Sequence, residues 1–173
     1  MKTPFLPVLL IALAAQCLAS PPVAPSLAGT WKLDPARSAD PSSWSDIELT
    51  IAVNGDTVTL TRKFTTGNRS AGEVMALDMT KKENKVPVAW WPDNRYIGVY
   101  ISGDKTRAIR ASWIDNKRIL RLDSDLVLAT QQGDTPVNIL SDYKISDDGR
   151  ELVLVELRSS RLQPVIYQFT RVK

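Results

Sequence analysis

The 173-residue sequence contains no histidine and a single cysteine, Cys17. Without histidine the chain cannot form a Ser-His-Asp triad, a Cys-His couple or a histidine-ligated zinc site. A glycine-rich phosphate loop and a nucleophile elbow are also missing. We therefore expect no catalytic residues, no metal and no cofactor. A calcium site made only of carboxylates and a paired-carboxylate enzyme remain open, although Asp123 and Asp125 lack the spacing of an EF-hand loop.

Blocks of like charge are also scarce. Lys and Arg together number 22 and Asp and Glu 19, which gives a net charge of +3, and both signs are interspersed along the chain. This pattern does not predict a nucleic-acid partner or an anionic membrane as partner. The length suits one domain with a sizeable core.

The main apolar run lies at the start of the chain. Lys2 precedes it, and Cys17 and Ala19 supply the small residues of a leader cleavage site. Residues 1–19 are therefore predicted to be a signal peptide, since the run is too short for a stable membrane span. Lipid attachment at Cys17 is the alternative, although Gln16 stands where a small residue is favoured. The predicted location is the periplasm or the extracellular space.

The remainder reads as short strands separated by turns. After a proline-rich lead-in over residues 20–28, apolar and polar residues alternate, and Asn54-Gly55 and Asp147-Asp148-Gly149-Arg150 mark two hairpins. Asp34-Pro35 predicts one short helical turn. About 8–10 antiparallel strands predict an all-β domain over residues 29–173. An up-and-down barrel or a sandwich would accommodate them.

Two short stretches at the ends of this domain carry a resemblance. Gly29-Thr30-Trp31 opens it, and Arg171 lies near its close. This pairing resembles that of lipocalin-like barrels, and the run Gly29-Thr30-Trp31-Lys32-Leu33 is similar to the start of bacterial secreted lipocalin-like proteins of unknown function. The resemblance implies an antiparallel lipocalin-like up-and-down β-barrel with a buried Trp31, across which the Arg171 cation lies. An ordinary buried tryptophan of another β-sandwich is the alternative.

One candidate site follows from the alternation of inward and outward residues along a strand. Arg62 shares its face with the apolar Leu60 and Phe64. An arginine in that position faces water in an open cavity, pairs with an acidic group or a ligand, or is turned outward by a bulge. We interpret Arg62 as the orienting group of a ligand site, able to hold a carboxylate or phosphate. Trp113, on the same face as Ile109, is interpreted as the apolar wall of that site.

Three further features bear on the site. Arg107 also falls on an apolar face. In the strand after Asp147-Asp148-Gly149-Arg150, we expect Val153, Val155 and Leu157 to point inward. Glu156 and Arg158 would point inward only if this strand had the opposite parity. Trp90-Trp91 forms either a platform at the barrel rim or part of the core.

These features favour a protein that binds a small apolar or amphipathic molecule, because barrels of this strand number can hold one small ligand. The alternative is a structural or interaction module of the cell envelope with a filled core. A cavity lined by Arg62 and aromatic residues would favour the first, and a filled interior the second. The oligomeric state is left open by the sequence.

Overall fold

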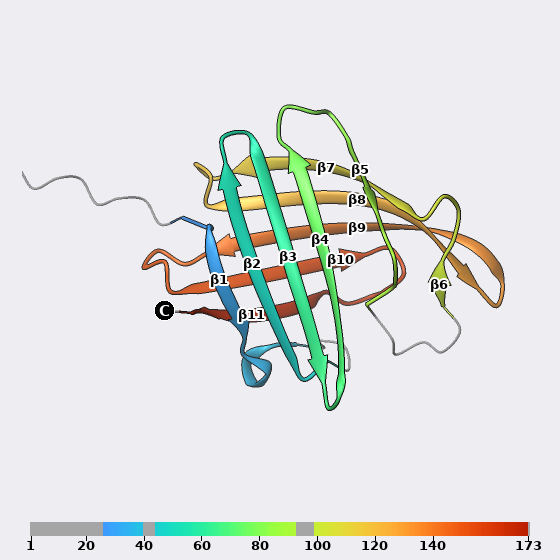
Figure 1. The fold of residues 1–173 in the computed structure, drawn as a ribbon, viewed down its shortest axis with the longest axis horizontal. Coiled ribbons are helices and arrows are strands. Elements are labelled where there is room, and N and C mark those ends of the chain that lie inside the picture. Colours follow the sequence, from blue (N-terminus) through green and yellow to red (C-terminus); the bar gives the residue numbers. More distant parts are fainter. Residues whose placement is uncertain (1–25, 40–43, 93–98, 173) are drawn as a thin grey trace, which may run out of the picture.

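The computed structural model describes residues 26–39, 44–92 and 99–172, which form one antiparallel sheet curled into a nearly closed barrel (Figure 1). The predicted leader lies outside these residues. Within the described ranges, no helix has the length and apolarity needed to cross a membrane. The elements are β1 (Gly29–Leu33), the 3-10 helix η1 (Pro35–Arg37), β2 (Asp46–Asn54), β3 (Thr57–Thr66), β4 (Arg69–Asp78), β5 (Asn84–Pro87), β6 (Tyr100–Ile101), β7 (Thr106–Ile114), β8 (Ile119–Thr130), β9 (Gly133–Ile145), β10 (Glu151–Arg158) and β11 (Val165–Arg171).

The strands follow one path around the barrel. Their order is β4-β3-β2-β1-β11-β10-β9-β8-β7-β5, with β6 paired to the end of β8. The first and last strands are joined, because β1 pairs with both β2 and β11. Figure 1 shows β2, β3 and β4 running steeply across the flatter β8, β9 and β10 behind them. The predicted antiparallel lipocalin-like barrel is confirmed, with an 11-stranded sheet in place of 8–10 strands.

The barrel wall is incomplete between β4 and β5, the two ends of the path. Side chains bridge them at two points. The Asn84 amide accepts from the Asp78 backbone N–H at 2.8 Å and donates to the Asp78 carbonyl at 3.1 Å. Beyond the end of β5, the Trp90 indole N–H donates to the Gly72 carbonyl at 3.2 Å. We call the stretch between these two bridges the β4–β5 gap; it spans about 20 Å of β4 at roughly 3.3 Å per residue.

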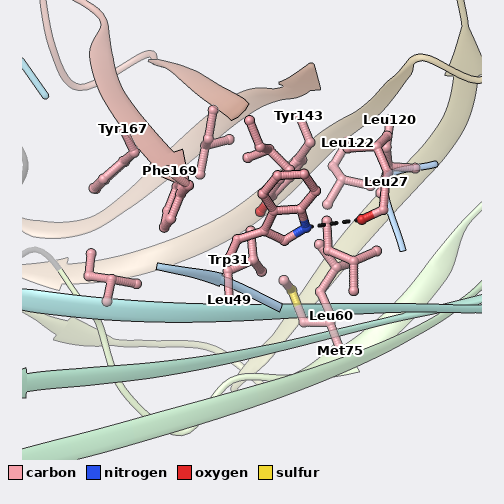
Figure 2. Packing of buried hydrophobic residues seen from close by; sticks show 14 of the residues in the cluster. Leu27, Trp31, Leu49, Leu60, Met75, Leu120, Leu122, Tyr143, Tyr167 and Phe169 are labelled. Carbon is pink, nitrogen blue, oxygen red and sulfur yellow. Dashed lines mark hydrogen bonds between the residues drawn. The ribbon is translucent and has the colours of Figure 1, made fainter. Parts of the chain in front are cut away.

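Trp31 lies in the middle of the core. Its side chain is 0% exposed, and its indole N–H donates to the Leu27 carbonyl at 3.0 Å (Figure 2). Figure 2 shows side chains from both walls of the barrel around it, among them Leu49, Leu60 and Phe169. A ring that packs against both walls fixes their separation at this level of the barrel.

Arg171 covers Trp31 as the resemblance implies. Its guanidinium carbon lies 4.1 Å from the Trp31 ring centroid. Its N–H groups also donate to three backbone carbonyls, those of Gly149 at 2.7 Å, Ala28 at 2.8 Å and Ser26 at 2.5 Å. The side chain therefore joins the start of the domain to the turn between β9 and β10.

Gly29 is required by the same arrangement. Its φ of +143° is one that side-chain-bearing residues rarely adopt, and a Cβ on it would overlap Arg171 Nη1. We expect Gly29→Ala to lower the free energy of unfolding by about 1–3 kcal/mol, the usual cost of forcing extra atoms into a packed site. Urea denaturation measures it. In an Arg171→Ala background the same change should cost less, and an equal cost would show that the overlap is not the cause.

The prediction that Val153, Val155 and Leu157 of β10 point into the barrel is wrong. Leu152, Leu154, Glu156 and Arg158 point inward, whereas Leu157 is 49% exposed on the outer face. Apolar residues occupy both faces in the first half of this strand, so alternation there does not distinguish inside from outside. The observed register places Glu156 and Arg158 where they can pair with one another and with Arg62 inside the barrel.

Candidate functional site

Charged side chains from four strands meet inside the barrel. Arg62 comes from β3, Glu73 from β4, Arg107 from β7, and Glu156 and Arg158 from β10. Each occupies an inward position in the alternation of its strand, on the same face as apolar core residues such as Leu60, Met75, Ile109 and Leu154. We call these five residues the arginine cluster.

Arg62 is buried and paired. Its Nε lies 2.5 Å from Glu73 Oε1 and its Nη1 3.4 Å from Glu156 Oε1. Burial by itself would lower the pKa of Arg62, but the carboxylates of Glu73 and Glu156 outweigh burial and raise that pKa above its ordinary value. Of the three outcomes expected for this residue, the structure shows pairing with acidic groups.

Glu156 lies between two arginines. Arg158 Nε donates to Glu156 Oε2 at 3.1 Å, and Arg158 Nη2 lies 3.5 Å from the Tyr167 hydroxyl. The Arg158 guanidinium also lies 5.5 Å from the ring centroid of Trp91. Burial opposes ionisation of Glu156, but Arg158 and Arg62 outweigh it and hold the pKa of Glu156 below its ordinary value. Glu156 is therefore a carboxylate at neutral pH.

Arg107 differs from the other two arginines. Its Nη1 lies 3.7 Å from the sulfur of Met75, and a thioether is a weak acceptor. Its buried Nε has no hydrogen-bond partner among the described residues. Burial lowers the pKa of Arg107, although an arginine this basic keeps its proton. A buried donor left without an acceptor destabilises a protein by about 1–3 kcal/mol.

The cluster carries a surplus of positive charge. It holds three guanidinium groups, those of Arg62, Arg107 and Arg158, against the carboxylates of Glu73 and Glu156. Charges interact more strongly in a protein interior than in water. An anionic group beside Arg107 would therefore balance the cluster and satisfy its free N–H.

Two cavities adjoin the cluster. The inner cavity, among Arg62, Glu156, Tyr143 and Trp91, has a volume of about 10 Å³, enough for one water molecule. Burial raises the pKa of Tyr143 to about 12, so its phenol is neutral. The outer cavity lies in the β4–β5 gap and has a volume of about 200 Å³. Residues lining the outer cavity are Gly72, Glu73, Val74, Met75, Val86, Pro87, Val88, Ala89, Trp90 and Arg107.

The structure does not bring Trp113 to Arg62. Trp113 lies near the end of β7 opposite Leu120, about 20 Å along the strand from Arg107. It packs, partly buried, against the core and does not line either cavity. The apolar wall beside the cluster comes instead from Trp91 and, across the gap, from Trp90. A ligand-binding role for Arg62 and Trp113 stays a prediction.

Sequence reasoning missed Glu73, although a signal was present. Glu73 shares the alternation of the apolar Met75 and Leu77, both of which are buried. The paired aspartates of β8 have other partners: Asp123 and Asp125 both contact Arg110 and the Asn138 amide. In the part of the chain that the structure describes, no three His, Cys, Asp or Glu side chains gather so as to hold a metal ion.

Comparison with known proteins now bears on this geometry. No protein-family model matches the chain, and no curated protein matches its sequence. Among solved structures, secretory abundant heat soluble protein 4 from Ramazzottius varieornatus is similar at a TM-score of 0.52 and 9% identity, over 84% of this chain and 94% of that one. The fold is that of a calycin-like barrel.

A second calycin-like barrel is also similar. The fatty-acid-binding protein from Manduca sexta matches at a TM-score of 0.47 and 9% identity, over 83% of this chain and 98% of its own. At such identities the likeness concerns the fold, and function has to be argued from the site.

Proposed function

We propose that this calycin-like barrel is an exported protein that binds a small amphipathic molecule, with the anionic group of that molecule in the arginine cluster. The observation that carries the proposal is Arg107, a buried cation whose Nε has no partner among the described residues. An anionic oxygen there would accept a charge-assisted hydrogen bond, which is about twice as strong as a neutral one. Export rests on the leader predicted over residues 1–19.

The charge balance supports the same ligand class. With Glu73 and Glu156 paired to Arg62 and Arg158, one more negative charge brings the cluster to neutrality. Pockets that bind small molecules are mostly apolar, with a few polar groups that fix orientation. The arginine cluster supplies those polar groups, and the barrel interior supplies the apolar surroundings.

An envelope interaction module is the second candidate, and one observation favours it. The inner cavity holds only about 10 Å³, so the barrel axis is filled by side chains. The outer face of β10 also carries the apolar Val153, Val155 and the 49% exposed Leu157. Native mass spectrometry of protein purified from its own host separates the two candidates: a bound small anion supports the binding protein, and its absence supports the module.

Arg107→Met tests the proposed role of that arginine. We expect this variant to unfold at a higher temperature than the native protein, because it removes a buried N–H donor that has no acceptor among the described residues, and such a donor destabilises a protein by about 1–3 kcal/mol. We also expect its affinity for octanoate to fall at least tenfold. Thermal denaturation and isothermal titration calorimetry measure the two effects.

Arg110→Met is the matched control. Arg110 lies on the same strand but bonds Asp123 and Asp125 at the surface. We expect octanoate to bind this variant as it binds the native protein. If Arg107→Met also bound octanoate with native affinity, the proposed function would be wrong.

A further inference from the structure

We propose that the apolar part of the ligand lies in the β4–β5 gap, across the barrel wall, and does not extend along the barrel axis. The ligand class is a compact carboxylate or phosphate monoester with a short apolar tail, and the gap is its route into the cluster. This inference rests on the proposed function and adds to it a position, an orientation and a size limit.

The available space is the first reason. The outer cavity holds about 200 Å³, roughly the volume of seven water molecules in the liquid, against about 10 Å³ for the inner cavity. The axis is occupied by large side chains that are fully buried, such as Trp31, Tyr143 and Phe169. A tail along the axis would have to displace this core, whereas the gap needs no displacement.

The position of Arg107 is the second reason. Arg107 and Met75 line both cavities, so they form the partition between the gap and the interior of the cluster. Arg107 is also the arginine whose Nε has no partner among the described residues. A ligand anchored there by its anionic group has the gap directly beside it for its tail.

The lining of the gap is the third reason. Apart from Arg107 and Glu73, the outer cavity presents apolar side chains, including those of Val86, Val88 and Trp90. Val74 lines it as well and is 61% exposed, which places Val74 at the solvent side of the cavity. A charged end inside and an apolar lining outside fit an amphipathic molecule inserted head first.

The construction of the gap is the fourth reason. No backbone ladder joins β4 to β5 in the described part of the chain, so a ligand can enter there without breaking strand pairing. The bridges from Asn84 to Asp78 and from Trp90 to Gly72 join the two edges at either end of the gap, so the gap is bounded along β4.

The test places a bulky side chain at the mouth of the gap. Val74→Trp changes an exposed residue, so we expect the variant to fold, which circular dichroism checks. We expect its affinity for octanoate, measured by calorimetry, to fall at least tenfold. The control is Leu157→Trp, on β10 in the opposite part of the strand path and 49% exposed; it should bind octanoate like the native protein.

A chain-length series provides the second measurement. From butanoate to octanoate we expect affinity to rise by roughly fourfold for each buried methylene, and then to level off because longer tails leave the gap for solvent. A steady rise through dodecanoate would overturn the inference, since the gap is too small to bury that tail. Octanol should bind at least tenfold more weakly than octanoate, and equal binding would overturn the role of Arg107.

The outcomes separate the two proposals. If octanoate binds the native protein, is lost in Arg107→Met and is retained by Val74→Trp, the proposed function stands and the gap is overturned. If Val74→Trp loses binding and Leu157→Trp does not, both stand. If neither octanoate nor butyl phosphate binds the native protein, both are overturned.

Discussion

Replacing Trp31 by alanine is expected to lower the free energy of unfolding by about 3–5 kcal/mol, the usual cost of deleting a large buried aromatic side chain. The indole is 0% exposed and lies between the two walls of the barrel. Its removal leaves a cavity, deprives the Leu27 carbonyl of its donor and takes away the ring beneath Arg171. Since domains are stable by about 5–15 kcal/mol, this loss is a large part of the total, and the variant should unfold at a much lower urea concentration than the native protein.

Urea denaturation followed by far-UV circular dichroism measures this loss. Trp31→Phe is the matched variant, because it keeps an aromatic ring but loses the N–H bond to Leu27 and part of the attraction to Arg171. It should be less destabilising than Trp31→Ala. If Trp31→Ala unfolded at the same urea concentration as the native protein, packing around Trp31 would not be what holds the barrel together.

The second large effect is expected at Glu156. Glu156→Gln keeps the shape of the side chain but removes a charge that Arg62 and Arg158 both contact. Three buried guanidinium groups would then face Glu73 alone. Removing one partner of a buried ion pair costs about 3–5 kcal/mol, and we expect a loss of this size in urea denaturation at pH 7. Glu151→Gln is the control: Glu151 pairs with Arg37 at the surface, where an ion pair contributes about 0–1 kcal/mol.

The same residue predicts a dependence on pH. In the folded protein the pKa of Glu156 lies below its ordinary value of 4.5, so the unfolded chain binds a proton more readily than the folded one. The stabilisation is complete above pH 4.5 and is lost as pH falls through the lower, folded-state pKa. Unfolding free energies measured from pH 7 to pH 3 should therefore fall less steeply for Glu156→Gln than for the native protein. Parallel curves would show that Glu156 does not contribute to acid unfolding.

The sequence predicts most strands of this fold because alternation is unambiguous where one face is apolar and the other is polar. Arg62 and Arg107 were placed inside on that basis, and both are buried. The rule fails on β10, where apolar residues occupy both faces. The first hairpin is also displaced by one residue, since its turn is Gly55-Asp56 and Asn54 still belongs to β2.

The site itself was predictable only in part, for a physical reason. Arg62 and Glu156 are 94 residues apart, and they meet only because the sheet curls until β3 and β10 face each other. The alternation of apolar and polar residues indicates which face of the sheet a residue occupies, but it does not indicate the position of that residue along the barrel axis. For this reason Arg62 and Trp113 were both expected to point inward, yet they lie at different positions along the barrel axis. The β4–β5 gap has no local signal at all, because it results from two strands that fail to pair.

The joining of β1 to β11 has a consequence for how the protein is made. Arg171 contacts the Ala28 carbonyl across 143 residues, so the barrel closes only when its last strand is complete. Contacts of such long range are slow to form, and a chain still being synthesised lacks the strand that β1 requires. For a protein that we propose is exported, closure by β11 would keep the growing chain unfolded, and thus able to pass through a secretion channel, until β11 has been synthesised.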